Sequence, residues 1–167
     1  MHIPYQFNDI DYWKAIVLYG LNVATYKIAF GKSLLNLSLL GSNEVLWEDL
    51  SREFFNQYLE RINNYPEAPQ QGNPARKTVM ERIVSKYQLN LIDYIQAIEE
   101  VGKNGFNDVV PRFQSIGNDK EFVGERFYSY DFGKKLYLKD PIHRIAENSI
   151  TELDDELEAR WSLLEGA

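Results

Sequence analysis

The chain has 167 residues, 44% of them hydrophobic and 26% charged, which is typical of one globular domain with a sizeable core. It contains no cysteine, which excludes disulfides, thiolate metal sites and cysteine nucleophiles within the chain and fits a cytoplasmic location. The net charge of −7 disfavours steering of nucleic acid by the whole molecule, but residues 72–144 carry 12 basic and 10 acidic side chains, a net charge of +2.

The first predicted elements are two helices that Gly20 separates. Asn8 or Asp9 can cap a helix that reaches about residue 19, and Gly20 would end or kink it. A second helix over residues 22–39 has a wide apolar arc, so we expect it at the centre of the core. Its other side carries Asn22, Thr25, Tyr26, Ala29, Lys32, Ser33 and Asn36. We expect neither a secretory leader nor a membrane span, because polar residues interrupt the apolar run.

Lys27 lies in the middle of this apolar arc, near Phe30 and Leu34. One interpretation is structural: the stem extends along apolar surface, or the ammonium pairs with a carboxylate. The other is that a segment or partner outside this chain completes the face. We expect a partly buried lysine that is hydrogen-bonded to a carboxylate or to carbonyl oxygens.

A turn at residues 41–43 and a short strand at residues 44–46 follow the second helix. The next segment, residues 48–63, is an amphipathic helix, and residues 65–72 form a loop. The predicted inward side chains of this helix are Leu50, Phe54, Phe55, Tyr58, Leu59 and Ile62.

Two more helices are predicted in the central third. Asn73-Pro74 indicates a helix start, because asparagine is favoured at the N-cap and proline at the first helical position. That helix would reach about residue 87. Asn90 is the predicted cap of another helix that ends at residues 102–105, and a short helix follows near residues 107–113.

The period of hydrophobic residues changes after Phe122. Residues 125–131 and 134–139 alternate as strands do around Phe132-Gly133, which predicts one small hairpin. Further helix starts are Asp140-Pro141 and the capping box Ser149–Glu152, after which one face carries Leu153, Leu157, Trp161 and Leu164. The fold class is therefore mainly α: an irregular multi-helix bundle with one hairpin near residues 125–139, organised as a single module over residues 1–167.

No set of residues assembles into a catalytic centre, and we predict no catalytic residue, metal or cofactor site. Asp131-Phe-Gly133 matches the metal-binding triplet of protein kinases, but the other kinase motifs are absent. His143 and Glu147 lie one helical turn apart, which supplies only two ligands. The acidic runs Glu99-Glu100 and Asp154–Glu156 are expected to be solvated helix faces. An enzyme is therefore the least favoured function for these 167 residues, because the sequence supplies no nucleophile, base and stabilising group that belong together.

Six basic residues are the candidates for contact with nucleic acid. Arg76, Lys77, Arg82 and Lys86 are predicted on one helix, with the first two in its first turn, where the helix dipole favours phosphate. Lys134 and Lys135 lie on the predicted hairpin among aromatic residues, a combination that suits backbone contact and base stacking. The alternative is an ordinary charged surface above a tyrosine-rich core.

Several segments resemble the amino-terminal region of bacterial HNH-endonuclease-domain proteins of the restriction or phage-defence type. The segments are Tyr12–Ile16, Ala24–Leu35, Gln71–Pro74 with Val79–Val84, Phe106–Phe113, and Arg126–Tyr128 with Asp131–Lys135. In that family a zinc-supported HNH centre with paired cysteines follows such a region. No catalytic residue carries over, because this chain has no cysteine and neither histidine lies in the family's histidine triplet.

The resemblance implies that these residues form the non-catalytic front part of a longer HNH endonuclease. Such a module would position DNA, another nucleic acid, a nuclease domain or a protein partner for chemistry performed elsewhere. The alternative is a stand-alone protein-interaction or regulatory subunit. Neither reading involves a membrane.

Overall fold

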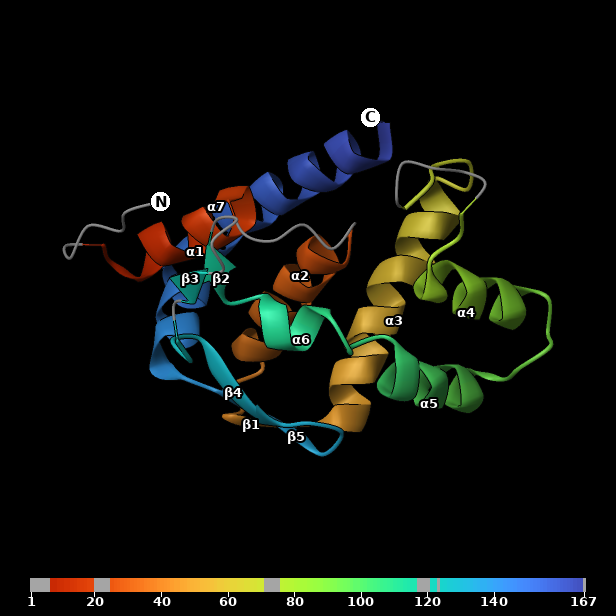
Figure 1. Ribbon diagram of the computed structural model, residues 1–167, viewed down its shortest axis with the longest axis horizontal. Coiled ribbons are helices and arrows are strands. Elements are labelled where there is room, and N and C mark those ends of the chain that lie inside the picture. Colours follow the sequence, from red (N-terminus) through yellow and green to blue (C-terminus); the bar gives the residue numbers. More distant parts are fainter. Residues whose placement is uncertain (1–6, 20–24, 71–75, 117–120, 123, 167) are drawn as a thin grey trace.

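The computed structural model describes residues 7–19, 25–70, 76–116, 121–122 and 124–166, in which seven helices and five short strands surround one hydrophobic core (Figure 1). The helices are α1 (Asp9–Tyr19), α2 (Tyr26–Leu39), α3 (Trp47–Asn64), α4 (Val79–Gln88), α5 (Tyr94–Asn104), α6 (Val109–Arg112) and α7 (Asp140–Gly166). The predicted mainly α class is confirmed. Within the described ranges, no helix is both long enough and apolar enough to span a membrane.

Helix α2 is the central element, with α7 on one side and α3 on another (Figure 1). Gly31 faces Trp13 and Leu157, and a Cβ there would lie 3.4 and 3.5 Å from them, which is ordinary van der Waals contact, so the packing at this position does not require glycine. The predicted start of this helix at Asn22, and the predicted break at Gly20, lie outside the described residues. The side opposite the predicted apolar arc is covered as well, because Thr25, Ala29, Lys32 and Ser33 on that side are all buried.

Helices α3, α4 and α5 form a second group of packed helices, on the right in Figure 1. All predicted inward residues of α3 contribute to the core: Leu50, Phe54, Phe55 and Tyr58 are fully buried, and Leu59 and Ile62 pack against them. Both α4 and α5 begin with capping boxes, in which the residue before the helix and the third helical residue satisfy each other's backbone N–H groups.

These capping boxes correct two predicted helix starts. Helix α4 begins at Val79, after the cap Thr78, so Arg76 and Lys77 precede the helix and are not in its first turn. The Asn73-Pro74 pair lies outside the described residues. Asp93, not Asn90, caps α5, and Asn90 has a positive φ of 59°, a conformation that asparagine tolerates after a helix.

The predicted hairpin is present and belongs to a three-stranded antiparallel sheet. Its strands are β4 (Tyr128–Asp131) and β5 (Lys135–Leu138), and β1 (Glu44–Leu46) pairs with the other edge of β5. Gly133 has a φ of 84° in the turn, which explains the glycine there. A second pair, β2 (Ser115–Ile116) with β3 (Glu121–Phe122), was not predicted, since strands of two residues carry no readable period.

Helix α7 runs from the predicted start at Asp140 and departs from helical geometry at Ser149, where φ is −141° and ψ is 19°. This break coincides with the predicted capping box, so the two expected helices form one kinked element. Beyond the kink, Leu153, Leu157 and Trp161 are buried, as predicted, and Leu164 is half-buried. The second half of α7 therefore presents its apolar face to the core and its acidic residues to the neighbouring cations.

Candidate functional site

Three of the six predicted basic residues lie around one hollow at the beginning of α4. This basic hollow has a volume of about 580 Å³. One wall comes from the start of α4 and the residues before it, and the other from the connection between α5 and α6. Its lining residues are Tyr26, Arg76, Lys77, Thr78, Val79, Arg82, Asn104, Gly105, Asn107 and Asp108.

The cations of the basic hollow are exposed and largely uncompensated. Arg76 and Arg82 have no carboxylate within 4.0 Å among the described residues, and the Lys77 ammonium lies 3.7 Å from a Glu81 carboxylate oxygen. That carboxylate also accepts from the Thr78 backbone N–H at 2.9 Å, as part of the cap. The two guanidinium groups are therefore available to an anion that enters the hollow.

The backbone amides of the α4 N-terminus have partners already. The Glu81 N–H donates to Thr78 Oγ1 at 3.1 Å, and the Met80 N–H donates to the Tyr26 hydroxyl at 2.9 Å. Burial raises the pKa of Tyr26, so this hydroxyl stays protonated at neutral pH. An anion in the hollow would consequently be held by the side chains of Arg76, Lys77 and Arg82 and not by these two amides.

The opposite wall of the basic hollow carries hydrogen-bonding groups without a positive charge. Asn104 and Asn107 are exposed, and their side-chain amides make no hydrogen bond with any other described residue. The Asp108 carboxylate is 4.0 Å from Arg112 and faces solvent as well. These three residues were not predicted from the sequence, because only the packing of α5 against α4 places them in the same hollow as Arg82. The polar residues at the end of α5 are the local sequence feature that indicates an exposed hydrogen-bonding surface here.

The other predicted basic residues do not line the basic hollow, although Lys86 lines a neighbouring hollow of about 530 Å³ together with Lys77 and Arg82. The Lys86 ammonium donates to both carboxylate oxygens of Glu100, at 3.0 and 3.1 Å, and so joins α4 to α5. Lys135 lies 3.3 Å from Glu44 across the β1–β5 pair. Lys134 is exposed at the hairpin turn, and neither it nor Lys135 lines the basic hollow.

Lys27 is buried, with 5% of its surface exposed, and its ammonium donates to the Ile16 carbonyl at 3.2 Å. Burial, and after it the nearby charge of Arg160, lowers the pKa of Lys27 to about 8. The side chain thus connects α2 to the carbonyl end of α1. This hydrogen bond to a carbonyl agrees with the structural interpretation of Lys27.

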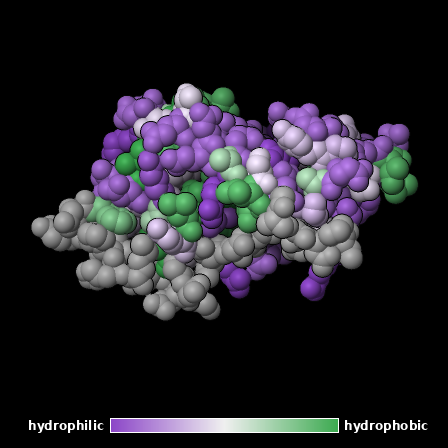
Figure 2. All heavy atoms as spheres, turned by 90° about the horizontal axis from the view of Figure 1, so that it is seen from above, coloured by the Kyte–Doolittle hydropathy of each residue, from purple (hydrophilic) through white to green (hydrophobic). Residues whose placement is uncertain are grey.

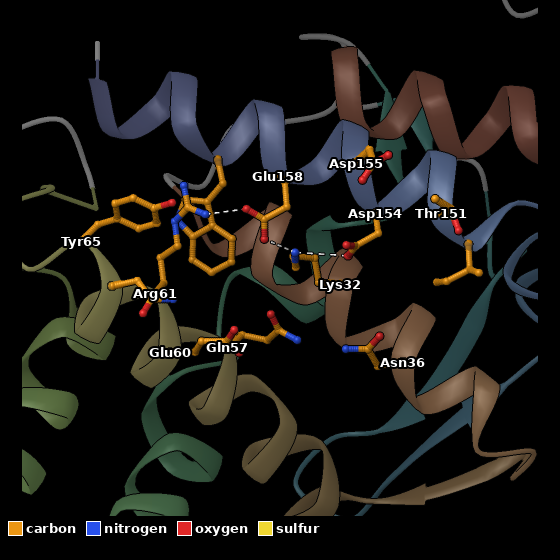
Figure 3. Close-up of a pocket in the computed structure, with 13 residues that line it drawn as sticks. Lys32, Asn36, Gln57, Glu60, Arg61, Tyr65, Thr151, Asp154, Asp155 and Glu158 are labelled. Atoms are coloured by element: carbon orange, nitrogen blue, oxygen red, sulfur yellow. Dashed lines mark hydrogen bonds and ion pairs between the residues drawn. The ribbon is translucent and has the colours of Figure 1, made fainter.

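A second hollow, the polar groove, lies between α2, α3 and α7 and has a volume of about 570 Å³ (Figure 3). Its cations are Lys32 from α2 and Arg61 from α3, and both point toward carboxylates of α7 (Figure 3). Lys32 pairs with Glu158 and lies 3.2 Å from Asp154, while Arg61 reaches Glu158 at 2.6 Å. Asp154, on the predicted solvated face of α7, is 40% exposed and also joins this ion-pair network.

The network of the polar groove continues into the interior. Arg61 Nε donates to both oxygens of the buried Glu165 at 3.0 Å, and Gln70 Nε2 donates to the same carboxylate at 2.8 Å. Gln70 Oε1 accepts from the Trp161 indole at 2.7 Å and from the Thr25 hydroxyl at 2.9 Å. Every hydrogen-bonding group of this buried cluster has a partner, which is the pattern of a structural network.

Glu158 connects the exposed and buried parts of the polar groove. Its burial acts to raise its pKa, but the hydrogen bond and charge of Lys32, followed by those of Arg61, outweigh burial and hold the pKa below the ordinary value of 4.5. The carboxylate is therefore ionised at neutral pH. Because Lys32 and Arg61 are already paired, the polar groove has little positive charge to offer a ligand.

A third depression, the apolar groove, is formed by α3, α5 and the β4–β5 turn and has a volume of about 550 Å³. The rings of Trp47 and Phe132 contact each other in it at a tilt of 54°, with centroids 4.8 Å apart, and Ile95 in its lining is 69% exposed. Figure 2 shows a further apolar patch at one end of the molecule. Leu89 and Leu91, in the connection between α4 and α5, are 67% and 68% exposed.

The His143–Glu147 pair forms no metal site in the structure. The two ring nitrogens of His143 are hydrogen-bonded to Ser38 Oγ at 2.8 Å and to Asn43 Oδ1 at 2.9 Å. In the part of the chain that the structure describes, no group of three or more histidine, aspartate or glutamate side chains is placed to hold a metal ion. His143 instead fastens α7 to the end of α2 and to the turn after it.

Comparison with protein-family models, with curated proteins and with solved structures finds no match for this chain. Of the three hollows described above, the basic hollow combines exposed cations with hydrogen-bonding groups that have no partner among the described residues.

Proposed function

We propose that this chain is a non-catalytic recognition module that holds nucleic acid by its phosphates at the basic hollow. The observation that carries the proposal is the convergence of Arg76, Lys77 and Arg82 on one hollow, with no carboxylate of the described residues within 4.0 Å of either arginine. Guanidinium groups bind phosphate oxygens through paired hydrogen bonds, and phosphate contacts position a protein on nucleic acid.

The net charge of −7 constrains how such a module works. A protein with this charge gains little from long-range attraction to nucleic acid, so binding depends on a few close contacts. Most of the acidic excess belongs to residues 145–167, where Glu158 and Glu165 are neutralised by Arg61. Contacts at the basic hollow would therefore be sensitive to salt and to the loss of a single arginine.

The proposal extends to an accessory role in an HNH-type nuclease, for which the resemblance of Tyr12–Ile16, Ala24–Leu35 and Phe106–Phe113 is the support. In that arrangement the zinc and the catalytic histidine belong to a segment outside these 167 residues. The encoded residues after Ala167 test this part: paired cysteines and an Asp-His pair in the same reading frame would support it. A stop codon would leave a stand-alone module.

The binding proposal is tested with a double charge reversal, Arg76→Glu with Arg82→Glu, and with Lys134→Glu/Lys135→Glu as the control. The control makes the same change of net charge away from the basic hollow. The affinity for fluorescent DNA is measured by anisotropy over a range of salt concentrations. We expect the first variant to bind at least about tenfold more weakly and to flatten the log–log salt slope by about 2, because each phosphate contact contributes roughly −0.9.

The control should keep most of the affinity of the parent. Equal losses in both variants would show that only net charge matters, and unchanged binding in the arginine variant would refute the proposed site. Circular dichroism of both variants tests whether either has unfolded: Arg76 and Arg82 make no ion pair among the described residues, whereas Lys135 of the control lies 3.3 Å from Glu44.

A second candidate function, a protein-interaction module, is favoured by the apolar groove. Exposed apolar surface next to aromatic side chains is typical of protein contacts, and Ile95 and Phe132 provide it here. The test is capture of a binding protein by the immobilised chain. The interaction should be lost in Ile95→Asp and kept in Leu163→Asp, which introduces the same change at an exposed leucine of α7.

A further inference from the structure

We infer that the basic hollow accommodates one unpaired nucleotide of a single strand, with its phosphate on the arginine wall and its base against the amide wall. The inference rests on the proposed function and adds the class of ligand. It starts from the two chain segments that line the hollow: Arg76, Lys77 and Arg82 come from the start of α4 and the residues before it, and Asn104, Asn107 and Asp108 come from the end of α5 and its connection to α6.

The two walls match the two ends of a nucleotide. A phosphate carries the negative charge and suits the guanidinium groups of Arg76 and Arg82. A base carries donors and acceptors on its edges but no charge, and suits the amides of Asn104 and Asn107, which are exposed and unbonded within the described ranges. A site for phosphate alone would leave the amide wall without a role.

The size of the hollow argues against contact with an intact duplex as its main use. At about 580 Å³ it falls within the range of small-molecule pockets and is a concave site instead of a flat, extended surface. A base can enter such a site only when it is unstacked and unpaired, and extraction from a duplex costs a few kcal/mol. Single-stranded nucleic acid presents such bases at much lower cost.

The chemistry of the amide wall indicates which bases fit. Asparagine pairs with the amino group and ring nitrogen of adenine, and a carboxylate accepts from the amino group of cytosine. Asp108, whose carboxylate is 4.0 Å from Arg112 and otherwise faces solvent, is such an acceptor. Thymine lacks an exocyclic amino group. We therefore expect adenine and cytosine strands to bind more tightly than thymine strands.

The experiment compares binding of short oligo-dA, oligo-dC and oligo-dT, of a duplex of equal length, and of 5′-AMP. The parent should prefer oligo-dA or oligo-dC over oligo-dT by at least about fivefold, the low end of discrimination by a paired contact. It should prefer single strands over the duplex by at least about tenfold, since a duplex must release its base. Tighter binding of 5′-AMP than of oligo-dA would overturn the inference.

The matched variants are Asn104→Ala/Asn107→Ala in the basic hollow and Gln57→Ala/Asn64→Ala in the polar groove, which remove two amides from different hollows. The first should reduce the preference for oligo-dA over oligo-dT to less than about twofold and leave the salt slope unchanged, because its phosphate contacts remain. The second should behave as the parent does.

The experiments distinguish a refutation of the nucleotide site from a refutation of phosphate binding at the basic hollow. If binding requires Arg76 and Arg82 but is equal for all strands and for the duplex, the nucleotide site is refuted and phosphate binding stands. If binding does not require these arginines, or no nucleic acid binds, both are refuted.

Discussion

The basic hollow and the polar groove have nearly the same volume, about 580 and 570 Å³, and each contains arginine and lysine. Their cations differ in burial and in ion pairing. In the polar groove, Arg61 and Lys32 are buried and bonded to carboxylates of α7. In the basic hollow, Arg76 and Arg82 are exposed and have no ion pair among the described residues. The number of basic residues therefore does not by itself identify a binding site.

The physical reason for the difference is desolvation. An arginine that loses its water needs partners for all its donors, and Arg61 finds them in Glu158, Glu165 and Ser162. An exposed arginine keeps its water and can exchange it for a ligand at small cost. We therefore expect the polar groove to contribute to stability and the basic hollow to contribute to binding. Substitutions in the two hollows test this difference, and those with the largest expected effect on stability come first.

Replacement of Arg61 by methionine should destabilise the protein by about 3–5 kcal/mol, because it leaves the buried carboxylate of Glu165 without its cation. Urea unfolding followed by circular dichroism measures the loss. The double variant Arg61→Met/Glu165→Gln removes the orphaned charge and should recover more than half of it. A single variant within about 1 kcal/mol of the parent would show that the network is not structural.

Lys27→Met tests the other buried cation through its pH dependence. The pKa of Lys27 is about 8 in the folded protein and 10.5 in the unfolded chain, so between these values the unfolded chain binds more protons. The stability of the parent relative to the variant should therefore rise with pH, by about 2 kcal/mol from pH 7 to about pH 9.5. Urea melts at several pH values measure it, and the tyrosine contributions cancel in the difference. A flat difference would contradict the lowered pKa.

Glu158→Gln tests the partly exposed end of the polar groove. The lowered pKa of Glu158 means that its stabilisation is fully present above pH 4.5 and is lost as the pH falls through the folded-state pKa. Its side chain is 46% exposed, so solvent screening limits the expected loss at neutral pH to about 1 kcal/mol or less. In acid melts the parent and the variant should converge; a gap that widens below pH 4.5 would contradict this assignment.

Arg76→Met and Arg82→Met should have the smallest effect on folding, within about 0.5 kcal/mol, because both side chains are exposed and neither forms an ion pair within the described ranges. Thermal melts at neutral pH provide the measurement. The same variants should weaken DNA binding, which is the reverse of the pattern expected for Arg61→Met. A loss of stability above about 1 kcal/mol would show that the basic hollow also has a structural role.

The sequence by itself determined most of the helical framework, because local signals specify it. The apolar face of α3, the helix start at Asp140 and the hairpin around Gly133 depend on periodicity, capping and turn chemistry within a few residues. The beginnings of α4 and α5 were misplaced, since several residues near each start can serve as caps and only the observed hydrogen bonds select Thr78 and Asp93.

The tertiary structure decided which charged side chains are buried and which remain available to a ligand. Lys32 and Arg76 are both basic residues with polar neighbours in sequence, but α7 covers the first and nothing among the described residues pairs with the second. Likewise, Asn104 and Arg82 meet only because α5 packs against α4. The pairing and burial of a charged side chain depend on contacts with residues far apart in the chain, and local sequence patterns do not predict those contacts.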